Sequence, residues 1–207
     1  ESNQIIIGSG AEYLYGLIIA MLGRQHIYGI ESPSYKKIEQ VYRAADVKYE
    51  LLPLSHDGID STALARTRAS VIHTTPYRSF PTGITASANK RHEYIRWSSK
   101  KRRIIIEDDF ESEFSVSPKP KETLYSLSDY DNVIYMNTFS KTISPALRVG
   151  YMVLPKRLVN DFESKLGFYS CTVPTFEQFV LAQLINSGDF ERHINRVRRS
   201  LRKRLYT

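Results

Sequence analysis

The sequence has 207 residues, which is long enough to form one sizeable hydrophobic core. Hydrophobic residues make up 42% and aromatic residues 12%, as in a soluble globular protein, and no apolar run approaches the roughly 20 residues that span a membrane. Cys171 is the only cysteine, which excludes an internal disulfide and predicts a reducing, cytoplasmic location without membrane attachment.

The net charge of +7 is concentrated near the C-terminus. Residues 192–204 contain seven Lys or Arg and no Asp or Glu, so the rest of the chain carries 22 basic (29 − 7) and 22 acidic residues. This distribution disfavours nucleic-acid binding by the whole surface. The chain also starts just before an apolar run at residues 5–7 and stops inside a helical apolar pattern that has no C-cap signal. We therefore expect it to be part of a longer protein.

The order of apolar patterns along the chain indicates the fold class. Apolar runs predict strands at residues 5–7, 27–31, 47–54, 70–74, 102–106, 133–136 and 149–154. Helical spacing predicts helices at residues 13–22, 36–45, 60–66, 88–99 and 158–166, one near Thr175 as N-cap, and a basic one from about Phe190. Strands that alternate with helices through short connections predict an α/β fold with a mostly parallel sheet flanked by helices.

A turn of small residues, Gly8-Ser9-Gly10-Ala11-Glu12, precedes the first predicted helix. Free backbone N–H groups and the positive end of the helix dipole make such a turn a natural seat for a phosphate. No Gly-Lys-Ser/Thr follows, so the turn is not a P-loop, and taken alone it more often marks an ordinary helix start. Tyr35, just after the second predicted strand, could stack on a planar ring or simply pack against the protein.

Residues 107–113 contain five acidic side chains. Such a run is usually a solvated loop, but this one begins directly after three isoleucines that are typical of a buried central strand. At least one of these carboxylates would then lie at the C-terminal end of the strand, where ligands bind in open α/β sheets.

The segment between the last two predicted strands holds a lysine, Lys141, among hydroxyl residues such as Thr138 and Ser140, and Arg148 follows. Burying an unpaired ammonium costs several kcal/mol, unless the amine is consumed in a Schiff base with an aldehyde. The hydroxyl groups and the guanidinium would suit a phosphate on the same ligand. An ordinary solvated loop lysine is the alternative.

Residues of five separate segments fall at the junctions between predicted elements. These residues are Gly8, Tyr35, residues 80–83, Asp108 and Lys141. Their shared placement on one rim of the predicted sheet favours a single ligand site over five unrelated features.

Together these residues resemble the large domain of fold-type-I pyridoxal-phosphate (PLP) enzymes, the aspartate aminotransferase superfamily. The nearer resemblance is to the aminotransferase-like domain of bacterial transcription regulators of the GntR-family MocR/GabR type. Residues 106–114 are similar to that group's Glu-Asp-Asp-Tyr-Asp-Ser-Glu-Phe signature, and residues 137–151 are similar to its lysine segment. Residues 31–35 and 80–83 match further family segments, so the resemblance covers nearly the whole chain.

The resemblance implies a role for each matching residue. Lys141 would hold PLP as a Schiff base, and Asp108 would pair with the pyridine nitrogen and so make the ring an electron sink. Tyr35 would stack on the ring, and the neighbouring Asp109 would be structural. The residues expected at the phosphate are Ser9, Gly10, Ala11, Thr138 and Arg148. No metal site is expected.

Three departures from the family pattern bear on activity. Phe110 stands where the signature usually has tyrosine, so a hydrogen bond to the phenolic oxygen of PLP is lost. Phe80 stands where true aminotransferases usually have an asparagine, and the regulator group also has phenylalanine at this position. Residues 77–79 also differ from the Ser-His-Gln common in that group. We therefore expect the chain to bind the cofactor and to show little or no transamination.

The resemblance implies the PLP-binding effector domain of a regulator. Residues 1–188 would form the large domain, and residues 189–207 a basic helix leading toward a C-terminal small domain outside this chain. An amine, an amino acid or PLP would act on a homodimer that reaches DNA only through an N-terminal helix-turn-helix domain. One alternative is a PLP-dependent aminotransferase of the 2-aminoadipate type, acting on an amino acid and a 2-oxoacid. A nucleic-acid-binding module that uses the basic helix is the other.

Overall fold

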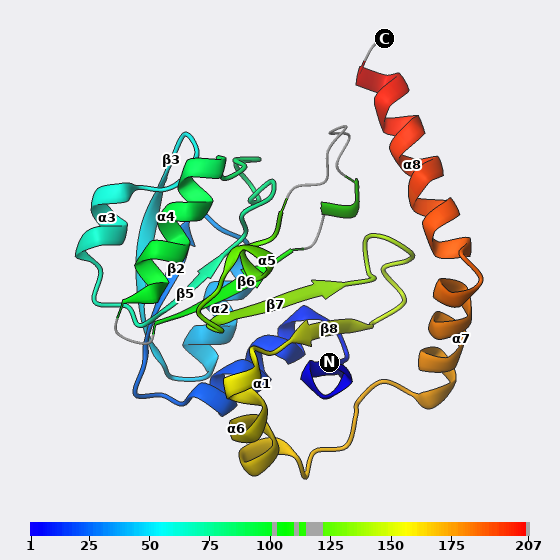
Figure 1. The fold of residues 1–207 in the computed structure, drawn as a ribbon, viewed down its shortest axis with the longest axis horizontal. Helices are drawn as coiled ribbons and strands as arrows, with labels where there is room; N and C mark the ends of the chain where they lie inside the picture. The colour runs from blue at the N-terminus through cyan, green and yellow to red at the C-terminus, as the bar shows by residue number, and fades with distance from the viewer. Residues whose placement is uncertain (101–102, 110–111, 115–121, 206–207) are drawn as a thin grey trace.

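The computed structural model describes residues 1–100, 103–109, 112–114 and 122–205. Within them, one mixed sheet has the strand order β1-β8-β7-β6-β5-β2-β3-β4 and carries helices on both faces (Figure 1). The strands are β1 (Ile5–Gly8), β2 (Ile27–Ser32), β3 (Lys48–Ser55), β4 (Gly58–Ile59), β5 (Val71–Thr74), β6 (Ile104–Asp108), β7 (Val133–Thr138) and β8 (Gly150–Val153). The helices are α1 (Ala11–Leu22), α2 (Lys36–Ala44), α3 (Ser61–Arg66), α4 (Ala88–Ser99), α5 (Leu124–Leu127), α6 (Lys156–Leu166), α7 (Thr175–Asn186) and α8 (Asp189–Leu205). The predicted α/β fold is confirmed.

The strand directions bring several strand ends to one edge of the sheet. β2, β3, β5, β6 and β7 are parallel to one another. β8 is antiparallel both to β7 and to β1, so β1 runs in the same direction as β7. The C-terminal ends of β1, β2, β5, β6 and β7 therefore lie at the same edge.

Each face of the sheet packs against its own set of helices. Ile104 and Ile106 of β6 pack with α1, α2 and α6, whereas Ile105 points to the other face and packs with α3, α4 and α5. Successive side chains of a strand alternate between faces, so a central strand covered on both sides must be apolar throughout. The three isoleucines are accordingly at most 5% exposed.

Local signals explain where several helices start and end. The Asp60 side chain accepts a hydrogen bond from the Ala63 N–H at 2.9 Å and caps α3. The Ser87 hydroxyl accepts one from the Lys90 N–H at 3.1 Å and caps α4. Capping side chains satisfy N–H groups that have no partner within the helix. α1 ends at Gly23, whose φ of 95° is accessible to glycine at little cost.

Several predicted boundaries are wrong, among them those of β6 and α7. β6 continues to Asp108 instead of ending at Ile106, because its last two residues pair with β7. α7 begins with Thr175 as its first residue, and Pro174 occupies the N-cap position, so no side-chain hydrogen bond caps this helix. Proline suits such a helix start because its ring already fixes φ and its missing N–H is not needed there.

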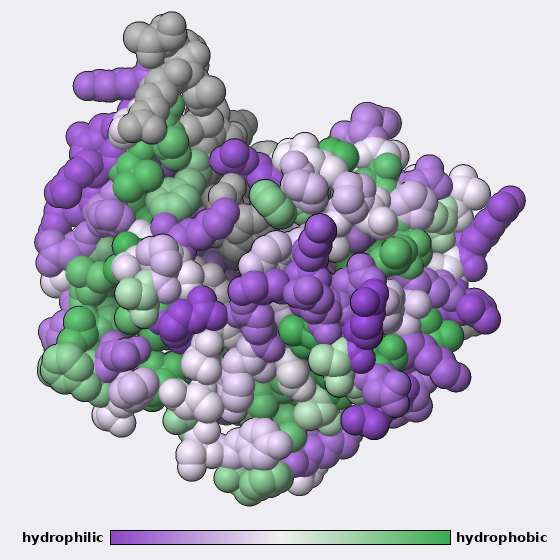
Figure 2. Space-filling model, turned by 180° about the vertical axis from the view of Figure 1, so that it is seen from behind, coloured by the Kyte–Doolittle hydropathy of each residue, from purple (hydrophilic) through white to green (hydrophobic). Residues whose placement is uncertain are grey.

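α7 and α8 lie together at one side of the sheet, and α8 runs from there to the C-terminus of the described chain (Figure 1). α7 exposes large apolar side chains, including Phe176 and Phe179, and green residues gather on that side in the view from behind (Figure 2). The basic terminal helix predicted from about Phe190 is α8, which begins at Asp189. No helix in the described ranges is both long enough and apolar enough to cross a membrane.

Candidate functional site

The residues predicted to share one rim do lie at one edge of the sheet. Gly8 ends β1, and Asp108 ends β6. Tyr35 and Phe80 follow the C-terminal ends of β2 and β5, and Lys141 follows that of β7. In the sheet register, Asp108 pairs with a residue of β7, the strand that leads to the lysine. Five segments that are far apart in the sequence are thereby collected along one edge.

Asp108 is buried, at 4% exposure. Its Oδ2 accepts a hydrogen bond from the Tyr15 hydroxyl of α1 and lies 3.4 Å from Nε2 of His73 on β5. Nδ1 of His73 lies 3.1 Å from the Tyr42 hydroxyl. Because an ionised carboxylate only accepts, His73 would carry its proton on Nε2 and accept from Tyr42 at Nδ1. Three elements thus supply the surroundings of one buried carboxylate.

The turn before α1, at residues 8–11, has the features of an anion-binding site. Gly10 is buried at the N-cap position with φ of 95°, and a Cβ there would lie 2.6 Å from Nη2 of Arg148. The absence of a side chain lets the guanidinium approach the positive end of α1, and both groups attract anions. In this structure Arg148 pairs with Glu12 at 2.8 Å, and the Ser9 N–H donates to Thr172 Oγ1 at 3.1 Å.

Lys141 lies in a short turn that the neighbouring backbone holds in place. The Phe139 N–H donates to the Val149 carbonyl at 2.9 Å, and the Ile143 N–H donates to the Phe139 carbonyl at 2.9 Å. Thr142 is buried, and its carbonyl lies 2.9 Å from Nε2 of His193 on α8. Lys141 itself is exposed.

Two aromatic residues stand near each other at the same edge. The Tyr35 ring lies 6.1 Å from that of Phe80 in an edge-to-face arrangement, and their exposures are 40% and 55%. Tyr35 occupies the N-cap position of α2, so its backbone is held by the start of a helix. An exposed aromatic face at the edge of a site can stack on a planar ligand.

Three carboxylates of the acidic run, at residues 107–109, are buried, and Glu113 is half-buried. Glu107 Oε1 and Oε2 accept from the N–H groups of Leu124 and Tyr125 at 2.8 and 2.9 Å, at the start of α5. Asp109 is completely buried, and its Oδ2 accepts from the Tyr135 hydroxyl at 2.9 Å. A solvated loop is therefore wrong for these residues, because the protein itself supplies their hydrogen bonds. The predicted departure at Phe110 lies outside the described residues.

Three residues near the candidate site were not predicted from the sequence. Tyr15 and His73 contact Asp108, and Glu12 occupies the guanidinium of Arg148. His73 ends an apolar strand run, which offered a weak signal, since a polar ring among buried residues needs partners. Tyr15 lies four residues after Ala11 and hence on the same face of α1. The sequence shows Glu12 only as an acidic residue in the first turn of a helix, which does not indicate a partner such as Arg148.

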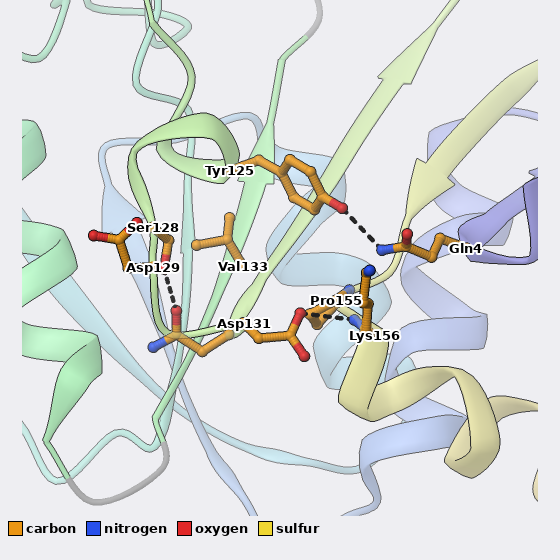
Figure 3. A pocket seen from close by; sticks show the side chains of 9 residues that line it. Gln4, Tyr125, Ser128, Asp129, Asp131, Val133, Pro155 and Lys156 are labelled. Atoms are coloured by element: carbon orange, nitrogen blue, oxygen red, sulfur yellow. Dashed lines mark hydrogen bonds between the residues drawn. The ribbon is translucent and has the colours of Figure 1, made fainter. Parts of the chain in front are cut away.

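A cavity of about 380 Å³ lies elsewhere, at the N-terminal end of β7 (Figure 3). Its lining includes Gln4, Tyr125, Asp131 and Lys156. Gln4 Nε2 donates to the Tyr125 hydroxyl at 3.0 Å, and the Lys156 N–H donates to Asp131 at 2.7 Å. These polar groups hold together the segment before β1, α5 and the start of α6. The cavity is thus separate from the edge that carries Asp108.

The comparison with known proteins agrees with this geometry. Residues 1–206 match the family described as Aminotransferase class I and II. The HTH-type transcriptional regulator YdeL of Bacillus subtilis is 31% identical over 98% of this chain and 44% of its own length. The probable rhizopine catabolism regulatory protein MocR of Rhizobium meliloti is 29% identical over 95% of this chain and 40% of its own length. The chain therefore spans less than half the length of these relatives.

A solved structure supports the same assignment. LysN, the α-aminoadipate aminotransferase of Thermus thermophilus, was determined with N-(5'-phosphopyridoxyl)-L-leucine bound. It superposes with a TM-score of 0.84 and 27% identity over 95% of this chain and 52% of its own. The fold is that of fold-type-I aminotransferases, and the family implies pyridoxal 5'-phosphate as the cofactor. The chain belongs to the aminotransferase class I and II family, and it is similar to helix-turn-helix transcriptional regulators over nearly its whole length.

Proposed function

We propose that this chain is the PLP-binding effector domain of a transcription regulator. The observation that carries the proposal is the similarity to helix-turn-helix regulators over nearly all of the chain, which coincides with a buried carboxylate and a lysine at one sheet edge. Residues 1–188 would form the large domain, and residues 189–207 would lead toward a small domain. DNA would be contacted through a helix-turn-helix domain outside this chain, and the protein would act in the cytoplasm.

Each predicted residue has a task in this proposal. Lys141 would supply the amine that links covalently to the aldehyde of PLP, with loss of water. Asp108 would hold the proton of the pyridine nitrogen, and Tyr35 would cover one face of the ring. The phosphate would lie against the residues Ser9, Gly10, Ala11, Thr138 and Arg148. When bound, PLP supplies an electron sink for chemistry at the α-carbon of an amine ligand.

Two observations on this chain agree with such a ligand. The close approach of Arg148 to Gly10, where a Cβ would come within 2.6 Å, leaves a cationic group at a helix N-terminus. Such a group is well suited to a dianionic phosphate. Asp108 is buried, and both of its described side-chain contacts, from Tyr15 and His73, use the same oxygen. In this proposal, the other oxygen would accept the proton of the ring nitrogen.

A working aminotransferase is the second candidate, favoured by the superposition on LysN. Phe80 offers only an apolar ring at the place where an amide is expected, and that ring is 55% exposed. We therefore expect little or no turnover of amino acid and 2-oxoacid pairs by the protein, including 2-aminoadipate with 2-oxoglutarate. Steady turnover at rates typical of enzymes, about 1 per second or more, would favour the enzyme over the sensor.

The decisive experiment is an absorbance titration with PLP for the wild-type protein, Lys141→Ala and Lys156→Ala. We expect a visible band that borohydride abolishes in wild type and in Lys156→Ala, whose lysine lies at the opposite end of the sheet. Lys141→Ala should lack the band. A band of equal strength in Lys141→Ala would contradict the assignment of the lysine, and no band in any of the three proteins would contradict PLP binding.

Two further measurements extend the same experiment. Titration of the PLP-loaded protein with amines and amino acids should shift the band for an effector that replaces the lysine amine. We propose a homodimer as the assembly, and sedimentation velocity of the loaded protein tests it. A monomer at micromolar concentrations would contradict the proposed homodimer and would leave the proposed cofactor unaffected.

A further inference from the structure

Tyr15 links α1, whose N-terminus is the proposed phosphate-binding site, to the buried carboxylate of Asp108. It is 3% exposed, and its hydroxyl donates to Oδ2 of Asp108. Its ring also packs edge-to-face against His73 at a centroid distance of 4.9 Å. Tyr15 comes four residues after Ala11, one turn further along the same face of α1. One rigid helix thus carries both the N-terminus proposed for the phosphate and a direct donor to Asp108.

We propose that Tyr15 is a positioning residue that orients the carboxylate of Asp108, and thereby favours a protonated ring nitrogen in a cofactor bound there. This inference rests on the proposed binding of PLP and adds a residue to that site. Tyr15 does not contact the reacting atoms in this role, because it acts through Asp108. The contact depends on α1 being seated on the sheet, which the apolar side chains Leu14 and Ile18 secure.

A hydrogen bond donated to a carboxylate favours its ionised form. Burial, together with the negative charge of Asp108, raises the pKa of Tyr15 well above its ordinary value, so the phenol stays a neutral donor. Tyr15 and His73 both donate to Oδ2. These hydrogen bonds favour the state in which the ring nitrogen carries the shared proton over the state in which the carboxyl group carries it.

The test uses PLP labelled with ¹⁵N in the ring and bound to the protein at its full natural length. We expect Tyr15→Phe to shift the ¹⁵N resonance toward that of an unprotonated pyridine and to weaken PLP binding about tenfold, as expected for a hydrogen bond to a charged group. Tyr13→Phe, two residues earlier on the same helix, is the matched control and should leave both quantities unchanged. In an Asp108→Asn background, Tyr15→Phe should have no further effect on the resonance.

Each outcome decides for or against the inference. An unchanged ¹⁵N resonance in Tyr15→Phe with PLP still bound would overturn the role of Tyr15 and leave the proposed function standing. A shift of equal size in the Asp108→Asn background would also overturn it, because the effect would not pass through Asp108. If the wild-type protein binds no PLP, the proposed function fails first and this inference with it. Should Tyr15→Phe not fold, 3,5-difluorotyrosine at position 15 keeps the ring and strengthens the donor, and we expect a shift in the opposite direction.

Discussion

Glu12 and Arg148 illustrate how single residues set the state of the candidate site. The Glu12 carboxylate pairs with Arg148 and with Lys37, each at 2.8 Å. Burial alone would raise the pKa of Glu12, but the hydrogen bond from Lys37 and the other contacts outweigh it and lower the pKa. Glu12 is therefore ionised at neutral pH. Glu12 therefore pairs with the Arg148 guanidinium, which a phosphate bound at the start of α1 would need.

We expect Glu12→Gln to bind inorganic phosphate roughly twofold to fivefold more tightly than wild type, because an exposed ion pair contributes only about 0.2–1 kcal/mol. Isothermal titration calorimetry at low ionic strength measures the change. Glu39→Gln is the control, since Glu39 pairs with Arg43 on α2. Equal or weaker phosphate binding by Glu12→Gln would show that Glu12 does not compete for Arg148.

At the scale of elements, Glu107 ties β6 to α5. Its two carboxylate oxygens accept from the backbone N–H groups of Leu124 and Tyr125. Burial raises the pKa of Glu107 to about 8, although both backbone hydrogen bonds favour the charged form. The folded state then holds a proton that the unfolded chain has lost, between about pH 5 and the folded pKa. Stability consequently falls as the pH rises through this window.

Glu107→Gln removes this proton uptake, so we expect a flatter dependence of stability on pH. The wild-type free energy of unfolding should fall relative to that of the variant by up to about 1.4 kcal/mol per pH unit between pH 5 and 8. Urea unfolding at several pH values measures both slopes. Glu163→Gln on the exposed side of α6 should keep the wild-type slope. Parallel curves for Glu107→Gln and wild type would contradict the raised pKa.

At the scale of the whole molecule, α8 is attached to the lysine turn by a few specific contacts. The Phe190 ring lies 5.8 Å from that of Phe139, and Nε2 of His193 lies 2.9 Å from the Thr142 carbonyl. Arg198 Nε donates to the carbonyl of Glu113 in the short helix η2 (Ser112–Phe114). A displacement of α8 would therefore act directly on the turn that holds Lys141.

We expect His193→Ala to destabilise the turn at residues 139–147 by about 1 kcal/mol, because a hydrogen bond to a buried carbonyl is lost. Hydrogen exchange of the amides in this turn should accelerate about fivefold. Arg199→Ala is the control, because Arg199 Nε donates to the Asn195 carbonyl of its own helix. Equal exchange rates in the two variants would show that α8 does not stabilise the turn.

The fold was largely predictable because its signals are local. Ile104-Ile105-Ile106 were predicted to form a buried central strand and do so, and the helix predicted at residues 60–66 is α3, with Asp60 as its N-cap. The end of β6 was missed because pairing with β7 overrides the charge of Glu107 and Asp108. The roles of the candidate site residues stay predictions, whereas their collection at one edge follows from the strand directions.

The sequence by itself determined the alternation of strands and helices, the family resemblance and the residues proposed to hold a cofactor. It did so because periodicity, capping and motifs depend on neighbours along the chain. Only the tertiary structure decided that Tyr15 and His73 meet at Asp108, and that Glu12 pairs with Arg148 across 136 positions. These contacts join segments brought together by sheet order and by the packing of α1. Burial and electrostatics depend on that three-dimensional placement and leave no pattern in the order of residues.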